Sequence, residues 1–132
     1  MDTRDQFIKE FRGEMLGTIN PQSTPDEFFQ NQTLRPILKL QNDLFLEVFK
    51  NYIAKSKTDF FGFSIEKKLQ FIENSIQRDI KFRNSLKGIV IGLLTLEEYS
   101  RYILNSSALN KRMMALLIER LKSQVQLFEL QL

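Results

Sequence analysis

The sequence predicts an all-α protein, a helical bundle of about four longer helices joined by short connecting helices. Apolar residues recur at helical spacing in several segments, capping residues precede those segments, and the apolar–polar alternation of strands is nowhere sustained. The chain has 132 residues, a length that fits one domain and can bury a core without disulfides or metals. We therefore expect a single helical domain over residues 1–132.

The first predicted helix begins at Thr3, a capping residue. Gln6 stands where a side chain reaches back to the cap in a capping box. The predicted apolar face of this helix consists of Phe7, Ile8, Phe11 and Met15. A loop over 17–23, rich in glycine, asparagine and proline, is expected to separate this helix from the next.

Thr24 gives the strongest N-terminal signal of the chain. Pro25 follows it at the first helical position, where the missing N–H of proline has no intrahelical partner to lose. The sequence predicts a short helix over 25–32 and a long helix over about 33–55. The long helix has the cleanest amphipathic pattern of the chain. Its apolar stripe consists of Leu34, Ile37, Leu38, Leu44, Phe45, Val48, Phe49 and Tyr52.

A loop over 56–63 contains three phenylalanines, Phe60, Phe61 and Phe63. Aromatic side chains in a loop either plug the end of a core or form an exposed contact patch. We favour the plug. Ser64 and Asp79 then precede two further predicted helices as capping residues.

The last part of the chain is predicted to form a short helix and a longer one. Thr95 and Glu98 fit a capping box at the start of the short helix. A break or kink is expected at 105–107, and the last helix covers about 108–129. Its apolar residues spread over roughly half of its circumference, which exceeds what one seam of a bundle needs.

Histidine and cysteine are both absent from the chain. Their absence excludes Ser-His-Asp and Cys-His catalytic sites, zinc sites built on Cys or His, and di-iron sites that use Glu-x-x-His. A carboxylate-only magnesium site remains open, but Glu97 and Glu98 are helical neighbours whose side chains point about 100° apart. We expect no catalytic residue, no metal and no cofactor, and the sequence favours a protein that is not an enzyme.

The net charge of +3 is too small to indicate a nucleic acid or membrane partner by itself. The longest apolar run, over 89–94, is far shorter than the roughly 20 residues that span a bilayer. The N-terminus lacks an apolar signal region, and we expect a cytoplasmic protein. The basic residues Arg78, Lys81, Arg83 and Lys87 scatter around a helix. They predict a solvated face, and nucleic acid binding is the least favoured function.

Four polar residues lie within apolar stripes: Gln41, Asn110, Arg120 and Gln124. One interpretation is structural, with Gln41 and Asn110 bonded to each other, to a carbonyl or to water, and Arg120 reaching the edge of the core. The other is that Gln41, Asn110 and Arg120 line a small pocket between helices, in which Arg120 holds an anionic group.

Gly88 and Gly92 are spaced four residues apart in a predicted helix. Each glycine costs about 1 kcal/mol relative to alanine in a helix interior. We expect another helix to pack closely over them. The alternative is that a ligand approaches the backbone there.

The segments GEMLGTINPQSTPDEFFQNQTLRPILKLQNDLF (13–45) and NSSALNKRMMALLIERL (105–121) resemble a small bacterial family of uncharacterised proteins. The resemblance covers nearly the whole chain, and members of this family sometimes carry the label "glyoxalase". Metal-dependent glyoxalase I proteins use His and Glu ligands on βαβββ modules. This chain has no histidine and no predicted strands, so the resemblance implies a family and transfers no catalytic residue.

These observations lead to two main functional hypotheses. The first is a non-catalytic protein-interaction or scaffold module that acts as a homodimer, motivated by the wide apolar arc of the last helix. The second is a bundle that binds or converts a small anionic molecule through Gln41, Asn110 and Arg120.

Overall fold

The computed structural model describes residues 3–13 and 22–129, and within these ranges the protein is helical and contains no strand. The predicted all-α class is therefore confirmed. Met15 and part of the predicted 17–23 loop lie outside the described residues. The longer helices of the described part are α4 (Asn42–Lys55), α5 (Ile65–Arg78), α6 (Ile80–Ile91) and α8 (Ser106–Ser123).

Shorter helical elements connect these four or pack against their ends. They are α1 (Thr3–Arg12), α2 (Pro25–Phe29), α3 (Arg35–Leu40) and α7 (Leu96–Tyr102), with a π-helical turn over Gln30–Leu34 and 3-10 turns over Phe60–Gly62 and Val125–Leu127. Predicted capping residues begin several of them. The side chains of Thr24, Ser64, Asp79 and Thr95 each accept a hydrogen bond from the backbone N–H three residues on.

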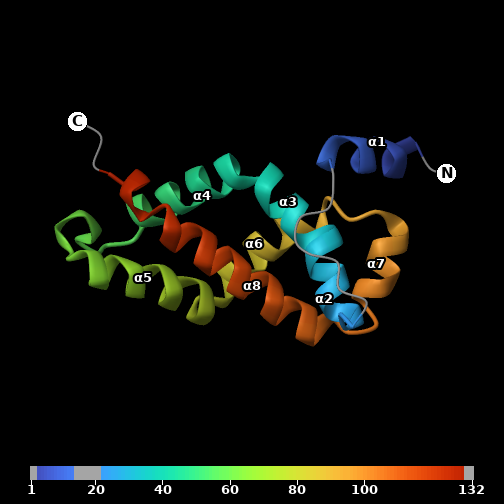
Figure 1. Ribbon diagram of the computed structural model, residues 1–132. Coiled ribbons are helices and arrows are strands. Elements are labelled where there is room, and N and C mark those ends of the chain that lie inside the picture. The colour runs from blue at the N-terminus through green and yellow to red at the C-terminus, as the bar shows by residue number, and fades with distance from the viewer. Residues whose placement is uncertain (1–2, 14–21, 130–132) are drawn as a thin grey trace.

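Helix α8 runs through the middle of the molecule and packs against α5, α6 and the π-helical turn (Figure 1). This central position explains the wide apolar arc that the sequence predicts. The arc is covered within the chain, since its buried members are Leu109, Met113, Met114, Leu117, Ile118 and Leu121. The arc therefore gives no support to an interface on α8.

The helices within 25–55 are divided differently from the predicted short helix over 25–32 and long helix over about 33–55. The helix that begins at Pro25 continues through the π-helical turn into α3, and the break lies at Gln41, whose φ of −91° and ψ of 9° end α3. Pro36 explains the π-helical turn, since it has no N–H to donate and its ring clashes with the carbonyl four residues earlier in an α-helix. The break at Gln41 also changes the phase of the apolar stripe, so Leu44 is exposed.

The predicted aromatic plug is confirmed. Phe60 is fully buried, and its ring lies 5.4 Å from that of Phe71 and 6.4 Å from that of Phe128, centroid to centroid. Phe63 packs against the same core, whereas Phe61 is partly exposed. The 3-10 turn that carries these residues closes the end of the bundle between α4 and α5.

The predicted apolar face of α1 is wrong for Phe7 and Phe11. Ile8 is buried, but Phe7 is 62% exposed and stacks on Phe11 with the ring centroids 5.5 Å apart. Polar contacts hold α1 in place instead. Arg4 and Arg12 donate hydrogen bonds to the carbonyl groups of the three residues that directly follow α6, namely Gly92, Leu93 and Leu94.

Asp5 completes the attachment of α1. Its carboxylate accepts a hydrogen bond of 3.1 Å from the backbone N–H of Leu96 at the start of α7. Cations favour the C-terminal end of a helix and anions favour the N-terminal end, because of the helix dipole. The charges of α1 thus match the two helix ends on which it lies.

The predicted close packing over Gly88 and Gly92 is wrong. Leu86 and Val90 form the buried face of α6, and Gly88 lies on the opposite, exposed side. A Cβ atom added at Gly88 would meet no heavy atom within 4 Å outside its own helical turn, and one added at Gly92 would meet only carbonyl oxygens of its own segment. The alternative, a ligand that approaches the backbone there, stays a prediction.

The last helix ends six residues earlier than predicted. Gln124 leaves the helical conformation, a 3-10 turn follows, and Phe128 folds back into the core. Within residues 3–13 and 22–129, no helix has the length and apolarity needed to cross a membrane.

Candidate functional site

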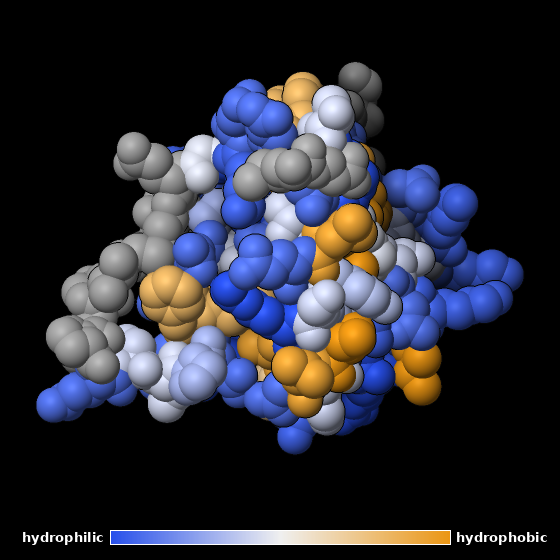
Figure 2. Space-filling model, turned by 90° about the vertical axis from the view of Figure 1, so that its right-hand side faces the viewer, coloured by the Kyte–Doolittle hydropathy of each residue, from blue (hydrophilic) through white to orange (hydrophobic). Residues whose placement is uncertain are grey.

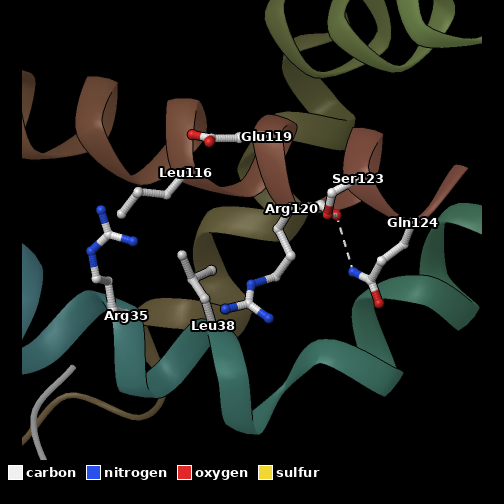
Figure 3. A pocket seen from close by; sticks show the side chains of 7 residues that line it. All are labelled: Arg35, Leu38, Leu116, Glu119, Arg120, Ser123 and Gln124. Carbon is white, nitrogen blue, oxygen red and sulfur yellow. Dashed lines mark hydrogen bonds between the residues drawn. The ribbon is translucent and has the colours of Figure 1, made fainter. Parts of the chain in front are cut away.

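A pocket of about 300 Å³ lies between α3 and the second half of α8. Figure 3 shows its lining, with Arg35 and Leu38 projecting from α3 and the other side chains from α8 and the residue that follows it. The lining residues are Arg35, Leu38, Leu116, Glu119, Arg120, Ser123 and Gln124. We call it the α3–α8 pocket.

The two arginines of the α3–α8 pocket have few protein partners. Arg35 donates from Nε to Oδ1 of Asn31 at 2.9 Å, and its Nη atoms make no hydrogen bond within the described part of the chain. Arg120 Nη1 lies 3.4 Å from Oδ1 of Asn42, which is longer than an ordinary N–H···O bond. Among the described residues, neither guanidinium group lies within 4.0 Å of a carboxylate oxygen.

The electrostatic environment of Arg120 is unfavourable for its charge. Burial lowers the pKa of Arg120, and the positive charge of Arg35 lowers it further. The Arg120 guanidinium stays protonated near neutral pH even so, because the ordinary pKa of arginine is far above 7. The pocket therefore holds two cations that repel each other, and an anion between them would relieve that repulsion.

A pair of side-chain amides holds Gln124, one of the lining residues, in place. Asn42 Nδ2 donates to Oε1 of Gln124 at 2.8 Å, and Gln124 Nε2 donates to Oδ1 of Asn42 at 2.8 Å. Gln124 Nε2 also donates to the carbonyl oxygen of Arg120 at 3.0 Å. This reciprocal pair ties the start of α4 to the end of α8 and holds the backbone of Arg120.

The three residues that the sequence groups into one pocket do not share one. Arg120 lines the α3–α8 pocket, whereas Asn110 lies almost three turns away on α8 and accepts a 2.5 Å hydrogen bond from the hydroxyl of Tyr102. Gln41 is the joint between α3 and α4 and lines neither of these places. Gln41 and Asn110 therefore do not bond each other, and the predicted three-residue site is wrong.

Asn110 lies in a second hollow, of about 450 Å³, between α6 and α8. Arg83 and Lys87 of α6 and Lys111 of α8 line this α6–α8 groove, and no Asp or Glu does. Arg83 and Lys87 are four residues apart and so share one side of α6. The sequence does not reveal that these three cations lie together, because the periodicity of one helix does not show which residues of a neighbouring helix lie opposite.

A row of exposed apolar side chains marks the outer side of α7. Glu98 and Tyr102 are the buried residues of this helix. The row, which we call the α7 surface, consists of Leu96, Tyr99, Ile103 and Leu104. Leu104 is 85% exposed. Figure 2 views this end of the molecule and shows apolar side chains gathered among hydrophilic ones.

An apolar hollow of about 550 Å³ adjoins the α7 surface, and Leu104 belongs to both. Pro25, Phe28 and Phe29 of α2 line one side of this hollow, and Leu109 of α8 lines another. Protruding apolar side chains thus lie next to an apolar hollow on the same side of the molecule.

A buried ion pair supports the inner side of α7. Arg12 Nη1 and Nη2 donate to Oε1 and Oε2 of Glu98 at 2.5 and 2.6 Å. Glu98 also accepts from the backbone N–H of Thr95 at 2.8 Å and from the hydroxyl of Thr33 at 3.1 Å. Burial raises the pKa of Glu98, but the hydrogen bonds from Arg12 and Thr95 outweigh it, so the pKa lies below its ordinary value.

The sequence identifies Glu98 only as part of a capping box, and it contains no signal that Arg12 meets it. The structure shows that both halves of the box form at Thr95. Among the residues that the structure describes, no three carboxylates lie close enough together to hold a metal ion.

Comparison with known proteins finds no match, whether with protein-family models, curated proteins or solved structures. The resemblance to a bacterial family therefore stays a prediction.

Proposed function

We propose that the chain is a non-catalytic, cytoplasmic protein-interaction module that binds through the α7 surface and forms a homodimer. The observation that carries the proposal is the row of exposed apolar side chains, Leu96, Tyr99, Ile103 and Leu104. Exposed apolar patches of this kind mark protein–protein contact sites, because covering them removes apolar area from water. The interface is thus assigned to α7 and not to α8, whose apolar arc is buried.

A second copy of the chain is the occupant that the shape of this surface favours. In a two-fold symmetric dimer the same patch serves on both subunits, so the patch must fit itself. The α7 surface provides protruding side chains, and the hollow beside it, between α2 and the start of α8, provides an apolar recess. The row of one copy fits against the recess of the other, and the reverse contact forms at the same time.

Sedimentation equilibrium tests this proposal. The wild-type chain should form a dimer within the range from about 10 µM to about 1 mM, which covers weak association. The double variant Ile103→Ser/Leu104→Ser should weaken the dimer by about tenfold or more, because it removes the centre of the apolar patch. Leu44→Ser is the matched control, since Leu44 is an exposed leucine on α4.

Two outcomes would overturn the proposal. A wild-type chain that sediments as a monomer over the whole range would exclude the homodimer. A dimer that Leu44→Ser weakens as much as the α7 double variant does would place the interface elsewhere.

A further inference from the structure

We propose that the α3–α8 pocket binds a phosphate group, free or carried by a small phosphorylated molecule, between the guanidinium groups of Arg35 and Arg120. This binding site is separate from the α7 surface and does not depend on dimerisation. Four features of the pocket support it: the lack of counter-ions, the free donor atoms, the size of the hollow and its net charge.

Arg35 and Arg120 share one pocket without a counter-ion among the described residues. Other arginines of the chain pair with carboxylates, as in Arg12–Glu98 at 2.5 Å and Arg101–Glu97 at 2.6 Å. Arg35 and Arg120 share a pocket, repel each other and have no carboxylate partner among the described residues. An anion bound from solution would supply the missing charge.

The donor atoms that remain free also fit an oxyanion. The amide of Gln124 is used by Asn42 and by the carbonyl of Arg120, and the hydroxyl of Ser123 donates to the same carbonyl at 2.7 Å. The free N–H groups therefore belong mainly to the two guanidinium forks. A planar fork matches two oxygens of one phosphate, and the terminal oxygens of a phosphate can accept from two forks at once.

The size and charge of the pocket favour a small anion. A hollow of about 300 Å³ lies at the lower end of the range for ligand pockets, so a compact group fits it better than a large cofactor. The lining carries two arginines and one glutamate, Glu119, a net charge of 2 − 1 = +1. A phosphate monoester carries about −1.5 to −2 near pH 7 and balances both guanidinium groups, whereas a single carboxylate balances one.

The negative charge of Glu119 should weaken phosphate binding in the α3–α8 pocket. Glu119 lines the pocket, but its carboxylate pairs with neither arginine, and Figure 3 shows it above the two guanidinium groups and not between them. Its negative charge opposes an incoming anion. Replacing it with glutamine should therefore strengthen phosphate binding, an effect that a general loss of structure would not produce.

Titration of the ¹⁵N-labelled full chain with inorganic phosphate at low salt, followed by NMR, tests the site. The amide signals of Arg35, Ile37 and Leu38 and those of 116–124 should shift with a single saturable dissociation constant, and a sugar monophosphate should shift the same signals. Arg35→Gln and Arg120→Gln should each weaken binding by about tenfold or more, since each removes a charged hydrogen-bonding partner. Arg120→Lys should recover part of the loss, and Glu119→Gln should tighten binding a few-fold.

Lys111→Gln is the matched control. Lys111 lies nine residues before Arg120 and therefore on the opposite side of α8, and its replacement removes one positive charge. The variant should bind phosphate as the wild type does. Unchanged binding in both arginine variants would overturn the proposal. Shifts confined to 83–87 and 107–115 that Lys111→Gln abolishes would also overturn it, because they would place the anion in the α6–α8 groove.

Discussion

The Arg12 guanidinium and the Glu98 carboxylate form a two-pronged ion pair, with Nη–Oε distances of 2.5 and 2.6 Å. Both side chains are almost buried, with 6% of Arg12 and 10% of Glu98 exposed. The pair joins α1 to α7 across 86 residues of sequence. It is the main charged contact that fixes the N-terminal helix to the end of the molecule that carries the α7 surface.

Glu98→Gln should lower the free energy of unfolding by about 3 kcal/mol, because removing one partner leaves the other charge buried without compensation. Glutamine keeps the shape of the side chain, but its NH₂ group then faces the donors that surround Glu98. Urea denaturation followed by circular dichroism measures the change.

The neighbouring pair provides the control for Glu98→Gln. Glu97 accepts from Arg101 at 2.6 Å, but both of these side chains are more than half exposed. Glu97→Gln should change the free energy of unfolding by less than about 0.5 kcal/mol, since water screens exposed ion pairs. Equal losses in the two variants would contradict the role assigned to the buried pair.

The stability of the protein should fall in acid. The folded pKa of Glu98 lies below its ordinary value of 4.5. Its contribution is complete above that value and is lost as the pH falls through the lower, folded pKa, because protons then bind preferentially to the unfolded chain. Asp79 acts in the same direction, since the backbone N–H of Phe82 and the hydroxyl of Tyr52 lower its pKa.

Urea denaturation between about pH 6 and pH 3 checks this dependence. The wild-type free energy of unfolding should decrease toward the acid end. In Glu98→Gln the decrease should be smaller but not absent, because Asp79 still titrates. An equal decrease in both proteins would show that Glu98 does not carry the acid sensitivity.

Local patterns predict the helices of this protein well, and contacts between helices are where prediction from the sequence fails. Thr24, Ser64 and Thr95 cap helices as predicted, because a cap depends on residues within one turn. The break at Gln41 is not visible in the apolar pattern, which runs on through it.

In the α3–α8 pocket, too, the contact between helices is what the sequence does not predict. Arg120 stands out in the sequence because it interrupts an apolar arc, but Arg35 does not stand out in its own helix. The two meet only because α3 packs beside α8. Arg12 is missed for a related reason. If Phe7 and Phe11 faced the core, as the sequence predicts, the polar side of α1 would face solvent. The structure shows that α1 is attached by that polar side, which includes Arg12.

Gly88→Ala should stabilise the protein by about 0.5 to 1 kcal/mol. Alanine favours the helix and reduces the freedom of the unfolded chain, and a Cβ at this position meets open space. Gly92→Ala is the comparison, because its Cβ would lie 3.3 Å from the carbonyl oxygen of Gly88 and should bring little or no gain. Thermal unfolding of the two variants measures the difference, and a destabilised Gly88→Ala would indicate that something covers this side of α6.

Phe128→Ala should lower the free energy of unfolding by about 3 to 5 kcal/mol, although the residue follows the end of α8. Phe128 is 1% exposed, and its ring centroid lies 5.1 Å from that of Phe49 in the core. The change would leave a cavity where α4, α5 and the last turn meet.

Phe7→Ala is the matched control for Phe128→Ala. Phe7 lies near the other end of the chain, and its ring is 62% exposed, so its loss should cost less than about 1 kcal/mol. Urea denaturation of both variants gives the comparison. If Phe128→Ala proved as mild as Phe7→Ala, the last described turn would not belong to the core. Gln124, directly before this turn, donates to the carbonyl oxygen of Arg120 at 3.0 Å, so phosphate binding should weaken when Gln124 is replaced by alanine.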